Sequence, residues 1–177
     1  LVREALQQLI HEGLVEQTPH KGARVVRLTP EQMDEILGIR LLLECAAVRQ
    51  AALRLTRATR TELRGIARQM AAEQDATRFA QLDLQLHHRI WELSGNRTIT
   101  KLLDQVTGPL FAMSLLMRSA EQRRRRNDIR RGDHRQLVEA ICTGKEKPAE
   151  DAMRLHLTEN WPVIKERITR FLAEEEA

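Results

Sequence analysis

Residues 82–96 read LDLQLHHRIWELSGN, and this stretch decides the fold that the sequence predicts. At about 100° per residue, the apolar side chains recur on one helical face, which consists of Phe79, Leu82, Leu86, Ile90 and Leu93. Asp83 and His87 are spaced i,i+4 beside this apolar stripe, so they project together. His88 falls on the opposite, solvent-facing side. The stretch therefore predicts a core helix with one inward and one outward histidine.

Two later segments each add an inward histidine. His134 belongs to an apolar helical stripe, and His156 lies near the middle of the apolar face of the last predicted helix. Neutral imidazole together with carboxylate suits zinc and similar divalent ions. Asp83, His87, His134 and His156 are therefore candidate metal ligands. Three core histidines with ordinary hydrogen-bond partners are the alternative interpretation.

The composition is typical of a soluble, mainly helical protein. The 177 residues suffice for one sizeable domain, or for one domain plus a fragment. Aromatic residues make up only 3%, and glycine and proline are few, which favours helices with an aliphatic core. No apolar run approaches the roughly 18 residues of a membrane span, and no secretory signal is visible. We expect a cytoplasmic protein with no membrane partner, in which Cys45 and Cys142 are small core residues.

The charge distribution is compatible with nucleic acid binding. The net charge is +4 and the isoelectric point is about 9.6. Much of the positive excess comes from the run Arg123–Arg126 with Arg130 and Arg131, which we interpret as a solvated loop between two helices.

The first 27 residues predict a helix followed by a hairpin. Residues 1–12 form an amphipathic helix that ends at Gly13, and short strands over 14–18 and 23–27 flank a Pro19–Gly22 turn. A helix followed by a basic hairpin tip suggests a winged helix-turn-helix. In that arrangement the helix enters the major groove of DNA and the wing contacts the backbone or the minor groove.

The same segment, VREALQQLIHEGLVEQTPHKGARV, closely resembles the recognition helix and wing of GntR-family transcription regulators. The family pattern runs REAL-xx-L-xx-EGL and continues into a short wing that contains glycine. By this resemblance the chain begins inside the recognition helix, so either the native protein extends further or the chain is a fragment. The resemblance implies that Arg3 contacts DNA and that His20, Lys21 and Gly22 form the wing tip.

A capped helix start at Thr29 marks the next boundary. Thr29 is the expected N-cap, Pro30 the first helical residue and Gln32 the partner in a capping box. We therefore expect a DNA-binding segment over residues 1–28 and a helical domain over residues 29–177. Six helices are predicted after the wing, beginning near residues 30, 59, 75, 98, 134 and 148, with Thr59 capping the second and Pro162 bending the last.

Arg40 and Glu44 lie within the apolar stripe of the first of these six helices. One interpretation is an i,i+4 ion pair at the edge of the core. The other is an arginine presented to an anionic ligand. The sequence does not separate the two.

The helical segment resembles the FCD ligand-binding domain of FadR-type GntR regulators. The shared motifs are R-xxx-E, D-xxx-H followed by SGN, an acidic-His pair and AM-xx-HL, here at Arg40 and Glu44, Asp83 and His87, Ser94–Asn96, Asp133–His134, and Ala152–Leu157. The resemblance implies a mainly α protein, with a partial winged helix-turn-helix followed by an antiparallel six-helix FCD bundle. It also implies that Asp83, His87, His134 and His156 bind a divalent metal ion, with zinc expected and nickel or manganese as alternatives. Arg40, Glu44 and Asn96 would then bind a small carboxylate effector.

These features predict a DNA-binding transcription regulator, a repressor, that binds a palindromic operator as a homodimer and is not an enzyme. One alternative is a metal-dependent hydrolase that uses the same Asp and three His, with Glu44 as the nearest candidate base. The other is a metal-stabilised dimerisation module without an effector.

Overall fold

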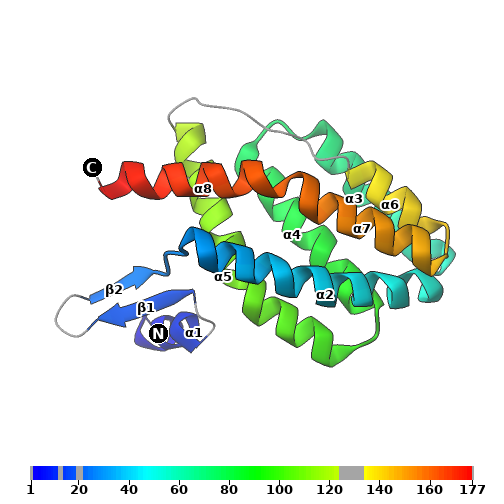
Figure 1. Ribbon diagram of the computed structural model, residues 1–177, viewed down its shortest axis with the longest axis horizontal. Helices are drawn as coiled ribbons and strands as arrows, with labels where there is room; N and C mark the ends of the chain where they lie inside the picture. Colours follow the sequence, from blue (N-terminus) through cyan, green and yellow to red (C-terminus); the bar gives the residue numbers. More distant parts are fainter. Residues whose placement is uncertain (1, 12–13, 19–21, 124–133, 177) are drawn as a thin grey trace.

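The computed structural model describes residues 2–11, 14–18, 22–123 and 134–176. The elements follow one another as α1 (Val2–His11), β1 (Val15–Thr18), β2 (Gly22–Val25), α2 (Pro30–Arg54), α3 (Arg57–Ala72), α4 (Ala76–Leu93), α5 (Arg97–Arg123), α6 (His134–Cys142), α7 (Glu146–Glu159) and α8 (Trp161–Glu176). The protein is therefore mainly helical with one small sheet (Figure 1). The predicted basic loop after Arg123 lies outside the described residues.

Strands β1 and β2 form the predicted antiparallel hairpin directly after α1. Their register pairs Val15 with Val25 and Thr18 with Gly22. Both strands differ by one or two residues from the predicted ends, as strand ends commonly do. Leu14 ties the hairpin to α1, because its backbone nitrogen donates to the Leu9 carbonyl at 2.9 Å.

Helix α2 is the axis on which the bundle is assembled. It contacts α4, α5, α6, α7 and α8, and it runs beside α7 in the opposite direction (Figure 1). Arg49 near the end of α2 lies 3.1 Å from Glu146 at the start of α7, and Asp34 near the start of α2 accepts a hydrogen bond at 2.8 Å from Trp161 of α8, just beyond the end of α7. The two contacts lie at opposite ends of α2, as an antiparallel course of α2 and α7 requires.

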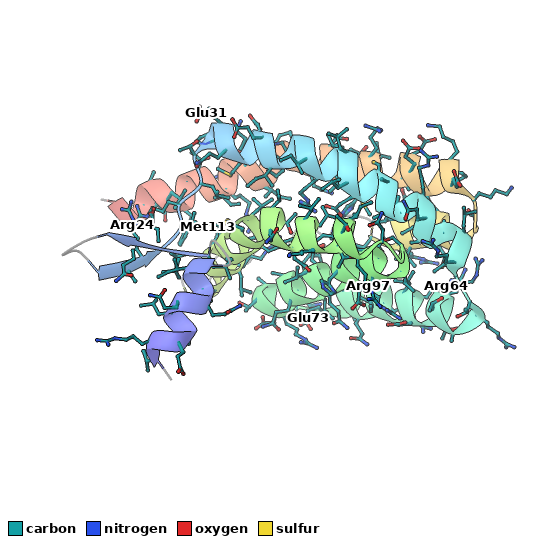
Figure 2. The ribbon with its side chains drawn as sticks, turned by 90° about the horizontal axis from the view of Figure 1, so that it is seen from below. Arg24, Glu31, Arg64, Glu73, Arg97 and Met113 are labelled. Carbon is teal, nitrogen blue, oxygen red and sulfur yellow. The ribbon has the colours of Figure 1, made fainter. Side chains whose placement is uncertain are left out.

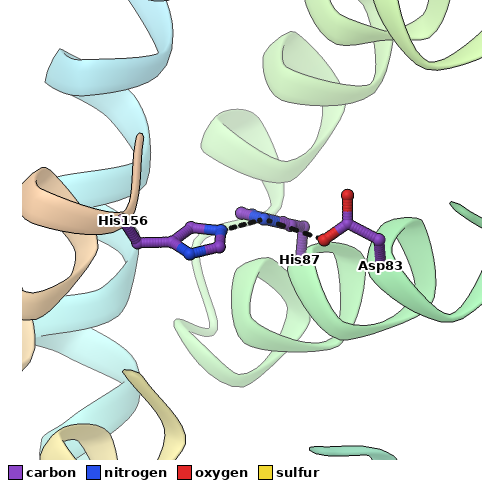
Figure 3. Close-up of side chains that lie close together, drawn as sticks. All are labelled: Asp83, His87 and His156. Carbon is purple, nitrogen blue, oxygen red and sulfur yellow. Dashed lines mark hydrogen bonds and ion pairs between the residues drawn. The ribbon is translucent and has the colours of Figure 1, made fainter. Parts of the chain in front are cut away.

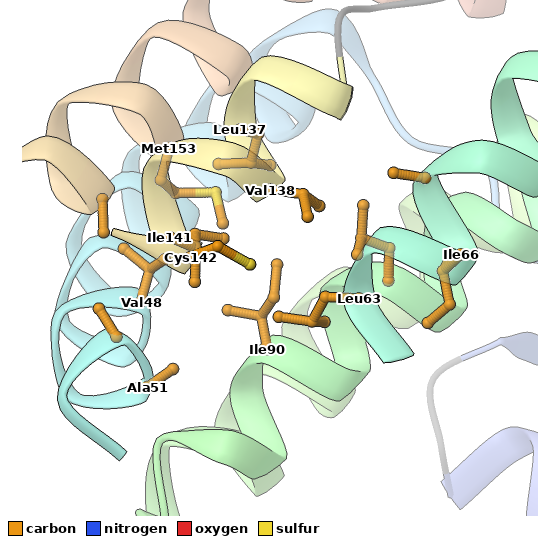
Figure 4. Close-up of a cluster of buried hydrophobic side chains, with 14 of the residues drawn as sticks. Val48, Ala51, Leu63, Ile66, Ile90, Leu137, Val138, Ile141, Cys142 and Met153 are labelled. Carbon is orange, nitrogen blue, oxygen red and sulfur yellow. The ribbon is translucent and has the colours of Figure 1, made fainter. Parts of the chain in front are cut away.

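The main core lies between α2, α3, α4, α6 and α7 (Figure 4). It is aliphatic, as the composition predicts, and both cysteines are buried in it as free thiols. A second cluster joins the segment after β2 to the bundle, because Leu28 packs with Met113 of α5 and with Trp161 and Ile168 of α8. Figure 2 shows Arg24 on the hairpin and Arg64 and Arg97 on the outer surface of the helices.

The capping box at Thr29 is confirmed. The Gln32 backbone nitrogen donates to the Thr29 hydroxyl at 3.2 Å, and the Thr29 nitrogen donates to the Gln32 side chain at 2.9 Å. The prediction that Thr59 caps the next helix is wrong, since Thr56 is the N-cap and Thr59 is the third helical residue. The Thr59 hydroxyl accepts from the Thr56 nitrogen at 2.9 Å and so takes the place of the Glu or Gln of a standard box.

Six helices were expected after the hairpin, but the described part of the chain contains seven there. The last predicted helix is divided into α7 and α8 at Asn160. Pro162 has no backbone N–H and cannot donate to a carbonyl four residues earlier, so the hydrogen-bond ladder breaks there. Among the described residues, no helix is long and apolar enough to cross a membrane.

Candidate functional site

Helix α4 carries the first two predicted ligands on its inner face. The Nε2 atom of His87 lies 3.7 Å from Oδ1 of Asp83, and the His87 side chain is only 1% exposed. His88 is 40% exposed and lies 3.4 Å from the carboxylate of Asp104 on α5. The inward and outward assignments of the two neighbouring histidines are therefore confirmed.

His134 and His156 reach the same place from α6 and α7. The Nε2 atom of His134 lies 2.8 Å from Oδ1 of Asp83, and that of His156 lies 3.2 Å from Nε2 of His87. Potential ligand atoms of Asp83, His87 and His156 all lie within 4.8 Å of one another (Figure 3). The ring centroids of His134 and His156 are 4.7 Å apart, so the fourth predicted ligand lies beside Asp83 and His156 but outside the group of three.

The spacings among Asp83, His87 and His156 fit a shared divalent ion. Bonds of about 2.0–2.2 Å from a zinc ion to nitrogen and oxygen place neighbouring ligand atoms roughly 3.3 Å apart in a tetrahedral site. The His87–His156 and His87–Asp83 distances of 3.2 and 3.7 Å lie on either side of that value. The donor set of imidazole and carboxylate is also one that zinc and similar ions accept.

Glu44 of α2 fixes the orientation of His87 from behind. Its side chain is fully buried, and its Oε2 atom lies 2.6 Å from Nδ1 of His87. An ionised carboxylate can only accept hydrogen bonds, so Nδ1 carries the proton and donates it. The lone pair of Nε2 then faces Asp83 and His156, as a metal-binding histidine requires.

The Glu44 carboxylate also accepts hydrogen bonds from two further donors. Arg40 Nε donates to Oε1 at 2.6 Å, and Trp91 Nε1 donates to Oε2 at 3.1 Å. Burial opposes the ionisation of Glu44, but Arg40 and His87 outweigh it and hold the pKa of this carboxyl well below its usual range. Arg40 and Glu44 thus form an interior ion pair, not one at the edge of the core.

The protonation states of the cluster also suit ligation. Burial opposes the ionisation of Asp83, but the hydrogen bond from His134 and the nearby histidines hold its pKa well below the usual range. Burial, followed by the charges that His87 and His134 can carry, lowers the pKa of His156 to about 3. At neutral pH the cluster therefore presents an ionised carboxylate and a neutral His156 imidazole.

A small cavity of about 60 Å³ lies beside the cluster, between the helices that supply the ligands. A single water molecule needs about 10–15 Å³ on this measure, so the cavity has room for a compact ligand. Arg40 lines it together with all four predicted ligands. The Arg40 guanidinium lies over the Phe111 ring, 5.3 Å from its centroid. Arg40 thus faces the cavity as well as pairing with Glu44.

Comparison with known proteins now assigns the family. A match to the FCD domain family covers residues 35–159. The chain belongs to the FCD domain family. The match includes Arg40, Glu44 and all four predicted metal ligands of the FCD domain.

Curated relatives of this FCD protein carry the names of transcription regulators. An uncharacterized HTH-type transcriptional regulator of Bacillus subtilis, YdhC, is 25% identical over 171 residues, which span 93% of this chain and 74% of the relative. The HTH-type transcriptional regulator LutR of the same organism is 25% identical, with 89% and 80% coverage. The prediction of a regulator that is not an enzyme is therefore confirmed.

Two solved bacterial structures share the fold. McbR/YncC of E. coli superposes with a TM-score of 0.75 at 19% identity, over 93% of this chain and 83% of that one. A GntR family member from Pseudomonas syringae pv. tomato gives a TM-score of 0.67 at 23% identity, over 99% and 71%. The resemblance to GntR regulators with an FCD domain is thus confirmed.

Two further predicted site residues, Asn96 and Glu44, do not line the cavity. Asn96 is not among the residues that line the cavity of the FCD domain; its side-chain oxygen accepts a hydrogen bond from the Ile99 nitrogen at 3.1 Å and caps the start of α5. Glu44 is a positioning residue, because its contacts are with Arg40, His87 and Trp91. Effector binding by Glu44 and Asn96 stays a prediction.

The predicted DNA-contacting residues are described only in part. Arg3 is exposed on α1, and Gly22 begins β2 with a φ of 86°, a conformation that glycine adopts readily. His20 and Lys21 lie outside the described residues. Their predicted role at a wing tip stays a prediction.

Two features of the FCD site carry no clear signal in the sequence. Arg118 of α5 is only 8% exposed and lines the cavity, but it directly follows the core residue Met117, so helical periodicity does not single it out. The Trp91 N–H group could have been suspected, since a buried indole nitrogen needs an acceptor. Its acceptor, Glu44, is 47 positions away in the sequence.

Proposed function

We propose that this FCD protein is a ligand-responsive DNA-binding repressor whose helical domain senses a small organic acid through a bound divalent metal ion. The observation that carries the proposal is the convergence of Asp83, His87 and His156, with ligand atoms within 4.8 Å, beside a cavity lined by Arg40. His134, whose Nε2 atom lies 2.8 Å from Oδ1 of Asp83, is the fourth proposed ligand. A homodimer in the cytoplasm, bound to a palindromic operator, is part of the proposal.

Asp83, His87, His134 and His156 would hold the ion, with zinc proposed and nickel or manganese as alternatives. A bound ion would supply a Lewis acid that accepts carboxylate oxygens. Arg40 binds the other oxygen of that carboxylate and orients it through hydrogen bonds from its planar guanidinium. Among the described residues, Arg40 donates only to Glu44, and it does so through Nε, so its two terminal nitrogens remain available to a ligand.

Contacts within the molecule connect the cavity to the hairpin. Trp161 and Ile164 of α8 line the cavity. Both also belong to the second core cluster, in which Leu28 and Val26 lie just beyond β2. A ligand that shifts the start of α8 would therefore change the packing under the DNA-binding segment. This contact chain supports a response of DNA affinity to the effector.

Segments α1, β1 and β2 would contact DNA. The names of the curated relatives as HTH-type regulators support a DNA partner. Arg3 is exposed on α1 and available to phosphate or base edges. A two-fold dimer would present two such segments to half-sites about one helical turn apart.

The experiment that tests the proposal measures DNA affinity of the full-length protein in three states. The states are chelator-treated, zinc-loaded, and zinc-loaded with a panel of small carboxylates. The DNA is a site selected from random double-stranded sequence, and fluorescence anisotropy reports binding. We expect a palindromic site, one dimer per site, and at least one acid that lowers affinity several-fold only when metal is present. DNA binding that no acid changes in any state would refute the sensing role.

A further inference from the structure

A second arginine lies in the same cavity as Arg40 but comes from a different helix. Arg118 of α5 is 8% exposed and lines the cavity together with Asp83 and the three clustered histidines. A guanidinium removed from water is costly unless the site makes use of its charge and its hydrogen bonds.

Both arginines are held on aromatic rings. The Arg40 guanidinium lies 5.3 Å from the centroid of Phe111, and that of Arg118 lies 5.5 Å from the centroid of Phe79. Such contacts attract the positive charge of a guanidinium to the face of the ring. Two of the three phenylalanines in the chain therefore contact the arginines of this one cavity.

The same two rings place each arginine beside a different histidine. The Phe111 ring lies 6.0 Å from the ring of His87, and the Phe79 ring lies 5.7 Å from the ring of His134. Arg40 is also linked to His87 through Glu44. The cluster is therefore flanked by one guanidinium near His87 and another near His134.

Positively charged side chains outnumber negatively charged ones in the cavity lining. Asp83 is the one acidic residue among the described residues that line it, whereas three guanidinium groups, those of Arg40, Arg118 and Arg167, do so. The Glu44 carboxylate lies behind this lining and is occupied by Arg40, His87 and Trp91. A ligand with two negative groups matches this lining better than a ligand with one.

We propose that the effector is a short dianion, a dicarboxylate, with one carboxylate at Arg40 and the other at Arg118. This inference rests on the proposed function, because it concerns the acid sensed at the same site. Each guanidinium can hold a carboxylate through two parallel hydrogen bonds, which makes the second carboxylate a determinant of specificity. The cavity volume of about 60 Å³ limits the ligand to a short carbon chain.

Matched pairs of acids test this inference. Zinc-loaded full-length protein is titrated by calorimetry with malonate against propionate and with succinate against butyrate. The members of each pair share a chain length and differ by one carboxylate. We expect the preferred dicarboxylate to bind about tenfold or more tightly than its monocarboxylate partner, the size expected for an added charge-assisted contact.

Variants assign the preference to Arg118. Arg118→Met should remove the preference for the dicarboxylate and leave the affinity for the monocarboxylate unchanged. Arg118→Lys should retain part of the preference. Arg97→Met, at an exposed position of the same helix, should change neither. Metal content and melting temperature are measured for each variant, and Arg118→Lys provides the test if Arg118→Met does not fold.

The possible failures are distinct. Equal affinity for both members of each pair, or an equal loss of both in the Arg118 variants, overturns the dianion inference and leaves the proposed function standing. Binding of none of the four acids to the zinc-loaded protein overturns both.

Discussion

Glu44 is the residue on which the arrangement of the site depends. Its buried carboxylate accepts hydrogen bonds from the side chains of Arg40, His87 and Trp91. Helical periodicity can pair Glu44 with Arg40 because the two lie four residues apart on one helix. It cannot show the contact with His87, which is 43 positions away. The sequence therefore offers the Arg40–Glu44 ion pair as one of two interpretations and does not show the orientation of His87.

Two neighbouring histidines provide a test at this scale. His87→Ala should sharply reduce the metal content of the protein, because it removes a buried ligand atom between Asp83 and His156. His88→Ala should leave it unchanged, since His88 is 40% exposed and faces Asp104. Metal per chain is measured by inductively coupled plasma mass spectrometry. Equal losses in the two variants would contradict the assignment.

A substitution at Arg40 tests effector recognition. Arg40→Lys keeps the charge but loses the planar fork, so effector affinity should weaken by roughly 1–3 kcal/mol. Metal content should stay intact, because Arg40 is not a proposed ligand. Calorimetry with a confirmed effector measures the change.

The matched control is Arg49→Lys on the same helix, where the arginine is half exposed and pairs with Glu146. It should leave effector affinity unaltered. If Arg40→Lys binds the effector as tightly as the wild type does, Arg40 is only an ion-pair partner of Glu44.

Helix boundaries show where local sequence is informative and where it fails. Thr29 was identified correctly because its box uses the usual Gln at the third helical position. Thr56 was missed because its partner is Thr59, a residue outside that pattern. The division between α7 and α8 was predicted only as a bend, although Pro162 marks its position.

The Thr29 cap begins the helix on which the bundle is assembled. Thr29→Ala removes the hydroxyl that accepts from the Gln32 nitrogen, and it should lower the free energy of unfolding by about 1 kcal/mol. For a domain of this size that corresponds to a melting temperature lower by roughly 2–4 °C, measured by calorimetry. Thr61→Ala, where the hydroxyl only donates back to the Arg57 carbonyl within α3, should change it little. A larger effect at Thr61 than at Thr29 would count against the role of the cap.

On the scale of the whole molecule, the sequence predicted the helices and the hairpin but not every contact between them. Long apolar stripes report which face of a helix is buried, and the inward histidines followed from those stripes. Packing partners far apart in sequence, such as Asp34 with Trp161 or Arg118 with Phe79, leave no periodic signal. The cavity is formed by such contacts, so its lining emerges only from the structure.

DNA binding belongs to this scale, because it requires two copies of the chain. Arg3→Ala should weaken operator binding by the full-length protein. Lys21→Ala should lower the slope of log affinity against log salt by about one if Lys21 contacts a phosphate. Lys147→Ala, at an exposed α7 position paired with Asp151, serves as the control and should change neither quantity. Affinity and salt slope that are insensitive to both test substitutions would refute the DNA-contact assignment.

The central claim is that Asp83, His87, His134 and His156 hold a metal ion at which an organic acid is sensed, and native mass spectrometry of the purified full-length protein tests it most directly. The account predicts a homodimer whose mass exceeds that of two chains by one divalent ion per chain, with a small organic anion retained at the same stoichiometry. A mass equal to that of the protein alone, unchanged after addition of zinc, nickel or manganese, would contradict it.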